Sequence, residues 1–461
     1  MKKMMHRSLT TGLAVTSIGL SLISSEFAPT ASAEPSAVSM SNGAYSTAIQ
    51  APVIKPSWSF PVIPIDRNQY SEQAVAVAEN GKVFAIDSNH RLVALEGSSG
   101  QKLWQYGGQL TPVLIHSNGT IYGMTQSGSI YAVTASGKKI WTTSLGFAKA
   151  DHIYRIGSTV YITQSEQTAA VDAASGKLKW KISENKDSYH GLNNLMETDG
   201  VLIRNYNVQG SLTFEQINAY DAKTGKKLWE SFRTSFPLTV KDGVVYSLAN
   251  TFMIDDDPVN RKVTIARYDL KTGESKGDRQ YRWTEAENKD GTFQSGGIYG
   301  SAFLYGKDLY VFQGKTLASY DFWNYKADSK PAHKWSQGDY EQLFPLSSIH
   351  EGRLFYQDFR TGGLIAMKLA SGQFIHYDYG DNPTVQADVF GKGVYVGQSD
   401  GVFHGYDLMT LKPVFSVNTG SRSFGPILKS GGMIFIQSGP SSACRQAACI
   451  SKINPKISRR I

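Results

Sequence analysis

The sequence is poor in cysteine and in charge, and after its first 23 residues it has no long apolar run. Two of the 461 residues are cysteine and 19% are charged. No segment beyond Ile23 is apolar enough to cross a bilayer, so a chain that spans the membrane is not expected. The chain also has no P-loop and no glycine fingerprint between a strand and a helix, the motifs of common nucleotide-binding folds.

The two cysteines, Cys444 and Cys449, lie close together in a turn-rich segment. In an exported chain, two such neighbours favour a local disulfide. Their spacing differs from Cys-x-x-Cys, so we do not predict a redox role.

Charge is balanced, with 47 Lys plus Arg against 39 Asp plus Glu. No basic cluster dominates any part of the chain, which argues against a nucleic-acid partner. The mild basic excess favours solubility and weak attraction to an anionic cell envelope.

The N-terminus has the layout of a secretory signal peptide. Lys2, Lys3 and Arg7 precede an apolar stretch from Leu9 to Ile23, and Ala31-Ser32-Ala33 follows. We predict a signal peptide over 1–33, cleaved after Ala33, and an extracellular mature protein. The alternative is a membrane anchor, but the apolar run is short and interrupted. Residues 34–56, rich in Ser, Ala and Pro, are predicted to form a flexible leader.

The segment from Gly119 to Trp141 shows the pattern on which the rest of the chain is built. Apolar residues alternate, and Ser-Gly turns separate short strands. The predicted strands are Pro112 to His116, Ile121 to Thr125, Ile130 to Thr134, and Lys139 to Thr143. Four short antiparallel strands in about 40 residues form one blade of a β-propeller.

This unit recurs along the chain. Its closing tryptophan is found at Trp104, Trp141, Trp180, Trp229, Trp283 and Trp335, and its turn glycine at Gly100, Gly137, Gly176, Gly225, Gly273 and Gly372. Two later units end near Phe374 and at Phe415 instead of tryptophan. The repeat predicts an all-β propeller of four-stranded antiparallel blades.

The two ends of the repeat region complement each other. A strand around Trp58 has no three strands before it, and three strands after Ile427 have no closing fourth. Pairing them in one sheet would close the ring and remove exposed edges. We therefore predict one propeller domain over 57–457, followed by a basic tail over 458–461. The bare count gives nine blades, but we favour eight because larger rings are outside the usual range.

The repeat resembles the pyrroloquinoline quinone-like (PQQ-like) propeller family over about residues 58 to 457. The resemblance is carried by GVVYSLAN with ARYDLKTG, and by GVYVGQSDGVFHGYDLMT. It implies that each closing tryptophan, including Trp58, docks against the adjacent blade. The family includes quinone-dependent alcohol dehydrogenases, the propeller lipoprotein of the outer-membrane assembly machinery, and many secreted proteins of unassigned role.

The chain lacks the features of the enzymatic branch of that family. The quinone dehydrogenases are similar in fold but carry adjacent cysteines and a calcium ion beside a catalytic Asp, which have no match here. We predict no cofactor and no catalytic residue. Gly397 to Gly401 fits a hydrolase motif, but it lies between two strands and is expected to be a hairpin turn. Asp255, Asp256 and Asp257 are a weak calcium candidate, because they lack the alternation and glycine of calcium loops.

Longer connections in the middle units favour one face of the propeller as a binding surface. They are Arg204 to Phe214, Asn250 to Lys262, Ala286 to Ile298, and Gln437 to Ala448. Tyr206, Phe252, Arg261 and Phe293 are the expected anchors, because aromatic and Arg residues contribute most at interfaces. The alternative is sequence drift in tolerant loops.

These features favour a secreted, monomeric, non-catalytic propeller that binds another protein or a component of the cell envelope. A quinone- and calcium-dependent oxidoreductase is the first alternative. A propeller that binds polysaccharide through exposed aromatic residues is the second.

Overall fold

A computed structural model describes residues 51–64, 76–147, 149–210, 212–250, 257, 259–285, 298–337, 343–358, 362–377, 382–441, 444 and 447–453. The chain divides into two compact units, Met1–Ala48 and Ile49–Ile461. All described residues lie in the second unit, and everything below concerns that unit.

Thirty-six strands in the described residues form nine sheets, each of four antiparallel strands. The nine sheets are numbered here as blades 1 to 9. Blade 1 contains β2 (Ala76–Glu79), β3 (Lys82–Ile86), β4 (Leu92–Glu96) and β5 (Lys102–Tyr106). Blade 2 contains β6 (Leu110–Ser117), β7 (Thr120–Thr125), β8 (Ser129–Thr134) and β9 (Lys139–Ser144). Blade 3 contains β10 (His152–Ile156), β11 (Thr159–Gln164), β12 (Gln167–Asp172) and β13 (Leu178–Ser183).

The middle blades contain the longest strands. Blade 4 contains β14 (Tyr189–Thr198), β15 (Val201–Gln209), β16 (Thr213–Asp221) and β17 (Lys227–Phe232). Blade 5 contains β18 (Thr234–Lys241), β19 (Val244–Ala249), β20 (Asn260–Asp269) and β21 (Ser275–Thr284). Blade 6 contains β22 (Ile298–Tyr305), β23 (Asp308–Gly314), β24 (Thr316–Asp321) and β25 (His333–Ser336).

The last three blades complete the series. Blade 7 contains β26 (Leu343–His350), β27 (Arg353–Asp358), β28 (Leu364–Lys368) and β29 (Phe374–His376). Blade 8 contains β30 (Thr384–Phe390), β31 (Gly393–Gln398), β32 (Val402–Asp407) and β33 (Pro413–Asn418). Blade 9 contains β34 (Leu428–Ser430), β35 (Met433–Ser438), β36 (Ala448–Ile453) and β1 (Trp58–Val62).

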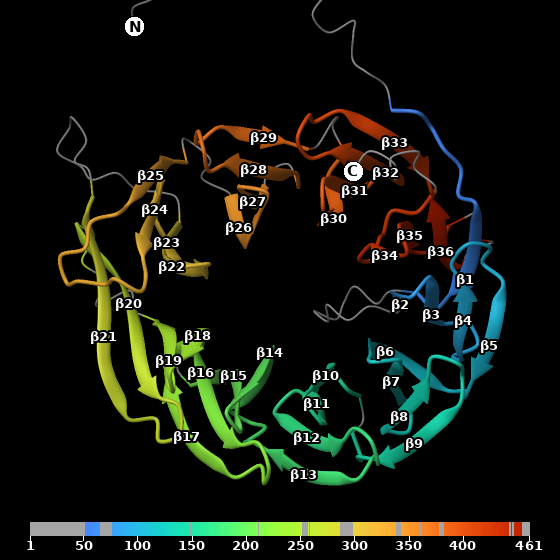
Figure 1. Ribbon diagram of the computed structural model, residues 1–461, viewed down its shortest axis with the longest axis horizontal. Helices are drawn as coiled ribbons and strands as arrows, with labels where there is room; N and C mark the ends of the chain where they lie inside the picture. The colour runs from blue at the N-terminus through green and yellow to red at the C-terminus, as the bar shows by residue number, and fades with distance from the viewer. Residues whose placement is uncertain are drawn as a thin grey trace, which may run out of the picture. The chain divides into compact units, whose positions relative to one another are not determined.

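The preference for eight blades is therefore wrong, because the described residues form nine. Figure 1 shows the sheets following one another around a ring in chain order. Apolar clusters join neighbouring blades: Ile130 of β8, for example, belongs to the same buried cluster as Val160 of β11. Each repeat unit has apolar surface to bury against its neighbours, so none of them is left outside the ring. The usual size of propellers was a weaker guide than the count of repeats.

Blade 9 joins the two ends of the repeat region, as predicted. Strand β1 pairs antiparallel with β36, with Trp58 opposite Lys452 and Val62 opposite Ala448. The hydroxyl groups of Ser59 and Ser451 are 2.7 Å apart and form a hydrogen bond across this pair. The fourth strand of the last blade is thus supplied by the first strand of the domain.

The closing tryptophan and the turn glycine of the next unit form one repeated contact. Trp141 Nε1 donates a hydrogen bond of 3.0 Å to the carbonyl oxygen of Ala173, and its ring lies against Gly176. A Cβ at Gly176 would be 2.6 Å from the ring, and the φ of +75° also favours glycine. The same indole hydrogen bond to the next blade is made by Trp58 to Gly97, Trp104 to Ala135, Trp180 to Ala222, Trp229 to Leu270, and Trp335 to Leu369. The docking implied by the resemblance is confirmed for these six tryptophans.

Trp283 packs against the apolar cluster shared by blades 5 and 6, but its indole N–H departs from the repeated hydrogen bond. Its Nε1 donates a hydrogen bond of 2.8 Å to the side chain of Glu285, which lies two residues later on the same blade. Arg279 of β21 donates instead to the carbonyl oxygen of Phe322 on blade 6. The Arg279 guanidinium also lies over the Phe322 ring, at 4.7 Å from its centroid. On blade 7 the Tyr377 hydroxyl donates 3.1 Å to the carbonyl oxygen of Leu408 on blade 8.

Candidate functional site

The predicted loop from Arg204 to Phe214 is a strand hairpin, which corrects the prediction. Strands β15 and β16 pair without interruption from Val201 opposite Asp221 to Gln209 opposite Thr213. Each strand has nine residues, whereas β11 and β12 of the preceding blade have six. The extension lies at the end of the blade that carries the connection between its second and third strands. The extra residues therefore lengthen blade 4 toward the face predicted for binding.

Tyr206 does not lie at the surface, so its predicted role as an anchor is wrong. Its side chain is fully buried, and its hydroxyl lies 2.9 Å from that of Tyr220. The Tyr220 hydroxyl donates a hydrogen bond of 2.6 Å to Glu184 and accepts a hydrogen bond from the side-chain amide of Asn218. Burial, with Tyr206 and Glu184 nearby, raises the pKa of Tyr220, which keeps its hydroxyl protonated as a donor. Tyr206 is part of a polar network that packs blade 4 against blade 3.

Arg261 lies between blades 5 and 6 and is engaged by side chains of the protein itself. Its guanidinium lies over the ring of Tyr299, 4.3 Å from the centroid. Its Nε is 3.6 Å from Glu285, and about a fifth of the side chain is exposed. The other two predicted anchors, Phe252 and Phe293, lie outside the described residues. The structure therefore does not show the four predicted anchors forming one surface.

A different apolar cluster is exposed at the end of the lengthened hairpin. Leu212 is 53% exposed and Phe232 is 51% exposed. The rings of Phe214 and Phe232 meet edge to face with their centroids 5.5 Å apart. Arg233 lies over Phe214 at 5.3 Å, and its Nε donates 3.1 Å to the carbonyl oxygen of Asn250 on blade 5. These four residues, Leu212, Phe214, Phe232 and Arg233, are called the Phe232 patch.

Sequence reasoning missed the Phe232 patch, although the repeat contains a signal for it. Phe232 lies three residues after the closing Trp229, and the two preceding units have Ser144 and Ser183 at this position. Ser144, Ser183 and Phe232 each end the outer strand of their blade. A large apolar side chain at a position that is Ser in the two preceding units signals an apolar residue at the surface.

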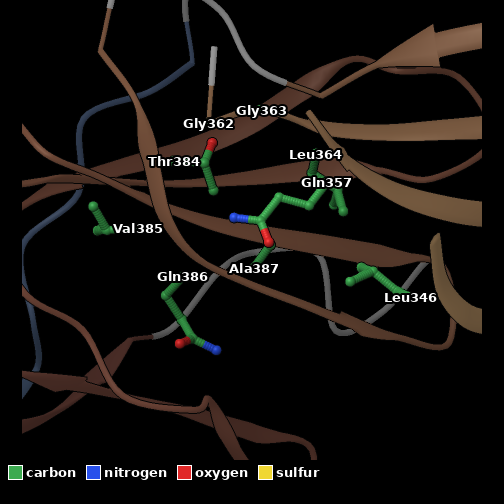
Figure 2. A pocket seen from close by; sticks show the side chains of 9 residues that line it. All are labelled: Leu346, Gln357, Gly362, Gly363, Leu364, Thr384, Val385, Gln386 and Ala387. Atoms are coloured by element: carbon green, nitrogen blue, oxygen red, sulfur yellow. The ribbon is translucent and has the colours of Figure 1, made fainter. Parts of the chain in front are cut away.

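A second feature is a cavity of about 220 Å³ between blades 7 and 8. Figure 2 shows its lining, with the side chain of Gln357 reaching across it toward Thr384 and Ala387. The lining residues are Leu346, Gln357, Gly362, Gly363, Leu364, Thr384, Val385, Gln386 and Ala387. All nine are uncharged.

The remaining predicted sites have simple local structures. Cys444 and Cys449 form the predicted disulfide, with their Cα atoms 6.2 Å apart. The turn after β31 is closed by a 3.0 Å hydrogen bond from Gly401 N to Gln398 O, which confirms a hairpin in place of a hydrolase motif.

The weak calcium candidate is described only at Asp257, since Asp255 and Asp256 lie outside the described residues. The Asp257 carboxylate accepts hydrogen bonds from the backbone N–H groups of Asn260 and Val259, which lower its pKa. Within the described ranges, no three His, Cys, Asp or Glu residues are grouped so as to hold a metal ion. In the same part of the chain, no helix has the length and apolar character needed to cross a membrane.

The fold and its repeated tryptophan contact define a β-propeller of PQQ-like repeats. The sequence matches, over residues 55–148 and 126–376, the family model described as outer membrane protein assembly factor BamB. These segments cover more than half of the chain, and the protein belongs to this family.

The solved structures to which this chain is similar have low sequence identity to it. BamB from Moraxella catarrhalis is 15% identical, with a TM-score of 0.47, covering 87% of this chain and 100% of its own. Quinohemoprotein alcohol dehydrogenase from Comamonas testosteroni is 13% identical, with a TM-score of 0.43, and the match covers 86% of this chain and 76% of that enzyme. A europium-containing methanol dehydrogenase is 14% identical, with a TM-score of 0.42, and the match covers 84% of this chain and 85% of that enzyme. These values carry no information about function. A search of curated proteins found no match.

Proposed function

We propose that this protein is an exported, non-catalytic scaffold that binds another protein through the Phe232 patch. The observation that carries the proposal is the exposure of Phe232 and Leu212 beside an arginine at the end of a lengthened hairpin. Aromatic and Arg residues contribute most of the binding energy at protein interfaces. Exposed apolar groups of this kind are common where partners dock.

The patch is held in place by the protein before any partner binds. Arg233 is fixed by Asn250 of blade 5 and by the ring of Phe214, so the patch joins two blades. A prearranged surface loses less conformational entropy on binding than a mobile loop. Fully burying an exposed Phe or Leu side chain is worth about 1.5–3 kcal/mol, so covering the exposed half of Phe232 or Leu212 is worth about half of that. Two such side chains can therefore anchor a specific contact.

The proposed setting is the cell envelope. The N-terminal 33 residues have the pattern of a cleaved signal, and the chain has a mild basic excess. The model of the family to which the chain belongs carries the description outer membrane protein assembly factor BamB. This description supports the proposal of a protein partner in the envelope. Family membership does not by itself separate a scaffold from an enzyme.

The proposal is tested by placing a photo-cross-linking amino acid at position 232 of the protein expressed in its native cells. Position 305 is a matched control, because Tyr305 is also aromatic and is 49% exposed at the connection between the first two strands of blade 6. We expect one defined protein adduct from position 232 and none from position 305, identified by mass spectrometry. Adducts of equal yield from both positions, or none from position 232, would contradict the proposal.

A further inference from the structure

The outer strands of blades 1 to 4 share a β-bulge, in which one extra residue stands before the closing tryptophan. In blade 1, Lys102 lies opposite Leu95 and Trp104 lies opposite Ala94, so Leu103 has no residue opposite it. The register shifts at the same place in β9, β13 and β17. Neighbouring side chains of a regular strand point to opposite faces, whereas a bulge changes the direction of one of them.

Each of these bulges exposes one lysine and one aliphatic residue next to each other. The aliphatic side chains are between 39% and 44% exposed, and the lysines beside them are exposed as well. The four bulge pairs are Lys102 with Leu103, Lys139 with Ile140, Lys179 with Leu178, and Lys227 with Leu228. Figure 1 shows their strands, β5, β9, β13 and β17, following one another along the outer edge of the ring.

The bulge does not itself require this composition, as blade 8 shows. The register of β33 shifts at the same place, with Pro413 and Val414 in the positions of a bulge pair. Neither side chain is exposed, and Val414 packs against a buried apolar cluster. Backbone hydrogen bonds join Ser416 of this strand to Pro52 and Ile54, which precede β1. Lysine beside an exposed aliphatic residue is therefore a property of blades 1 to 4 and not of the bulge.

Lysines are concentrated on the same four outer strands. From the turn glycine to the end of the outer strand, blades 1 to 4 contain eight lysines and one acidic residue, Glu230. The corresponding segment of blade 5, Gly273 to Thr284, contains three basic and two acidic residues. Within the described part of the chain, four of the eight lysines make no side-chain hydrogen bond or ion pair, namely Lys138, Lys139, Lys177 and Lys226. Asp172 and Asp221 of the adjoining turns accept hydrogen bonds from their own turns.

We propose that the bulge pairs bind the surface of a lipid bilayer that contains anionic lipid. Lysine ammonium groups are attracted to anionic headgroups, and aliphatic side chains enter the apolar layer beneath them. A soluble polyanion would leave the aliphatic side chains in water, and an apolar partner would bury the lysine charges without counter-ions. Connections between third and fourth strands all lie on one face of the propeller, so a flat surface can meet the four pairs together.

This surface and the Phe232 patch lie at opposite ends of strand β17. Lys227 and Leu228 begin the strand, and Phe232 ends it. A protein held on a bilayer through the bulge pairs therefore keeps the Phe232 patch away from the lipid and accessible to a partner protein. The two proposals use different residues, so failure of one leaves the other standing.

The test is flotation of the full chain, purified from its native cells in the form that they produce, with lipid vesicles. Vesicles of phosphatidylcholine alone are compared with vesicles of equal parts of phosphatidylcholine and phosphatidylglycerol. We expect the protein to float only with the anionic vesicles. It should be released at about 1 M salt, where the Debye length falls to about 3 Å.

A first variant combines Lys138→Gln, Lys139→Gln, Lys177→Gln and Lys226→Gln, and it breaks no ion pair among the described residues. The matched control loses the same charge at four exposed lysines of blades 6 and 8, through Lys326→Gln, Lys330→Gln, Lys334→Gln and Lys412→Gln. A lysine near an anionic surface strengthens binding about fivefold. We expect the first variant to bind anionic vesicles at least tenfold more weakly and the control to bind within about twofold of the unaltered chain.

A second variant keeps every charge and combines Leu103→Gln, Ile140→Gln, Leu178→Gln and Leu228→Gln. We expect it to bind anionic vesicles about tenfold more weakly, because its side chains no longer enter the apolar layer. Urea midpoints of all three variants check that they fold. The proposal is overturned if anionic vesicles do not bind the protein or neutral vesicles bind it equally. It is also overturned if the two lysine variants weaken binding equally, or if the folded second variant binds as tightly as the unaltered chain.

Discussion

At the scale of single residues, Gly176 and Gly243 have nearly the same backbone conformation but different surroundings. Their φ angles are +75° and +72°. Trp141 covers Gly176, whereas a Cβ at Gly243 would have no neighbour within 4 Å. The pair therefore separates the cost of a strained backbone from the cost of displacing the docked tryptophan.

We expect Gly243→Ala to lower the free energy of unfolding by about 1–2 kcal/mol, the cost of a left-handed conformation. Gly176→Ala should cost more by several kcal/mol, because the new methyl group collides with the indole and disturbs its packing. Urea unfolding followed by tryptophan fluorescence measures both changes. Equal losses in the two variants would show that the Trp141 contact contributes little.

Between blades 5 and 6, Arg279 makes the hydrogen bond to the next blade that a closing tryptophan makes elsewhere. We expect Arg279→Met to lower the free energy of unfolding by about 1–3 kcal/mol, because it leaves the Phe322 carbonyl oxygen without its donor. Trp283→Phe is the comparison, since the Trp283 indole donates its hydrogen bond to Glu285 of its own blade and phenylalanine keeps an aromatic ring in the cluster shared by blades 5 and 6. Calorimetric unfolding should show a larger loss for the arginine variant, and the reverse order would mean that the tryptophan remains the main link.

At the scale of single elements, strand β30 carries a buried carboxyl group whose pKa is raised. Burial raises the pKa of Asp388, while hydrogen bonds from Gln386 and Ile427 N–H partly oppose the shift. A carboxyl group with a raised pKa in the folded state is less easily ionised there than in the unfolded chain. Its contribution to stability therefore falls as the pH rises from its ordinary pKa through the raised value.

Asp388→Asn removes this ionisation and keeps an oxygen that can accept the same hydrogen bonds. We expect the variant to be more stable than the unaltered protein at pH 7, with the difference shrinking as the pH falls to 4. Urea midpoints at several pH values measure the effect. A variant that is less stable at pH 7 would show that the charged carboxylate is itself stabilising.

The strands could be predicted from the sequence where one face is apolar and alternation is clear. The hairpin β15–β16 could not, because buried Arg204, Asn205, Gln216 and Asn218 hide the alternation. Gln216 donates to Asn218, which donates to Tyr220, and this network reaches Tyr206. Single-sequence patterns do not distinguish such buried polar side chains from an exposed loop. The same network explains why Tyr206 was mistaken for a surface residue.

At the scale of the whole molecule, the repeat determined the fold and its closure, but not the function. Nine units in the sequence became nine blades, and the tryptophan spacing marked most of the links between them. The Phe232 patch and the cavity at Gln357 arise where individual units depart from the repeat. Their contacts could not be predicted from a single unit, because they form between neighbouring blades, as the hydrogen bond from Arg233 to the carbonyl oxygen of Asn250 shows.

The most direct test of the account is the affinity of the cross-linked partner, once identified and purified, for three forms of this protein. They are the unaltered chain, Phe232→Ser, which gives the residue found at this position in the two preceding units, and Tyr305→Ser as the control. We expect Phe232→Ser to weaken binding at least tenfold, corresponding to loss of about 1.4 kcal/mol or more, with Tyr305→Ser unchanged and both variants fully folded. Unchanged affinity of Phe232→Ser would contradict the claim that this patch is the binding surface.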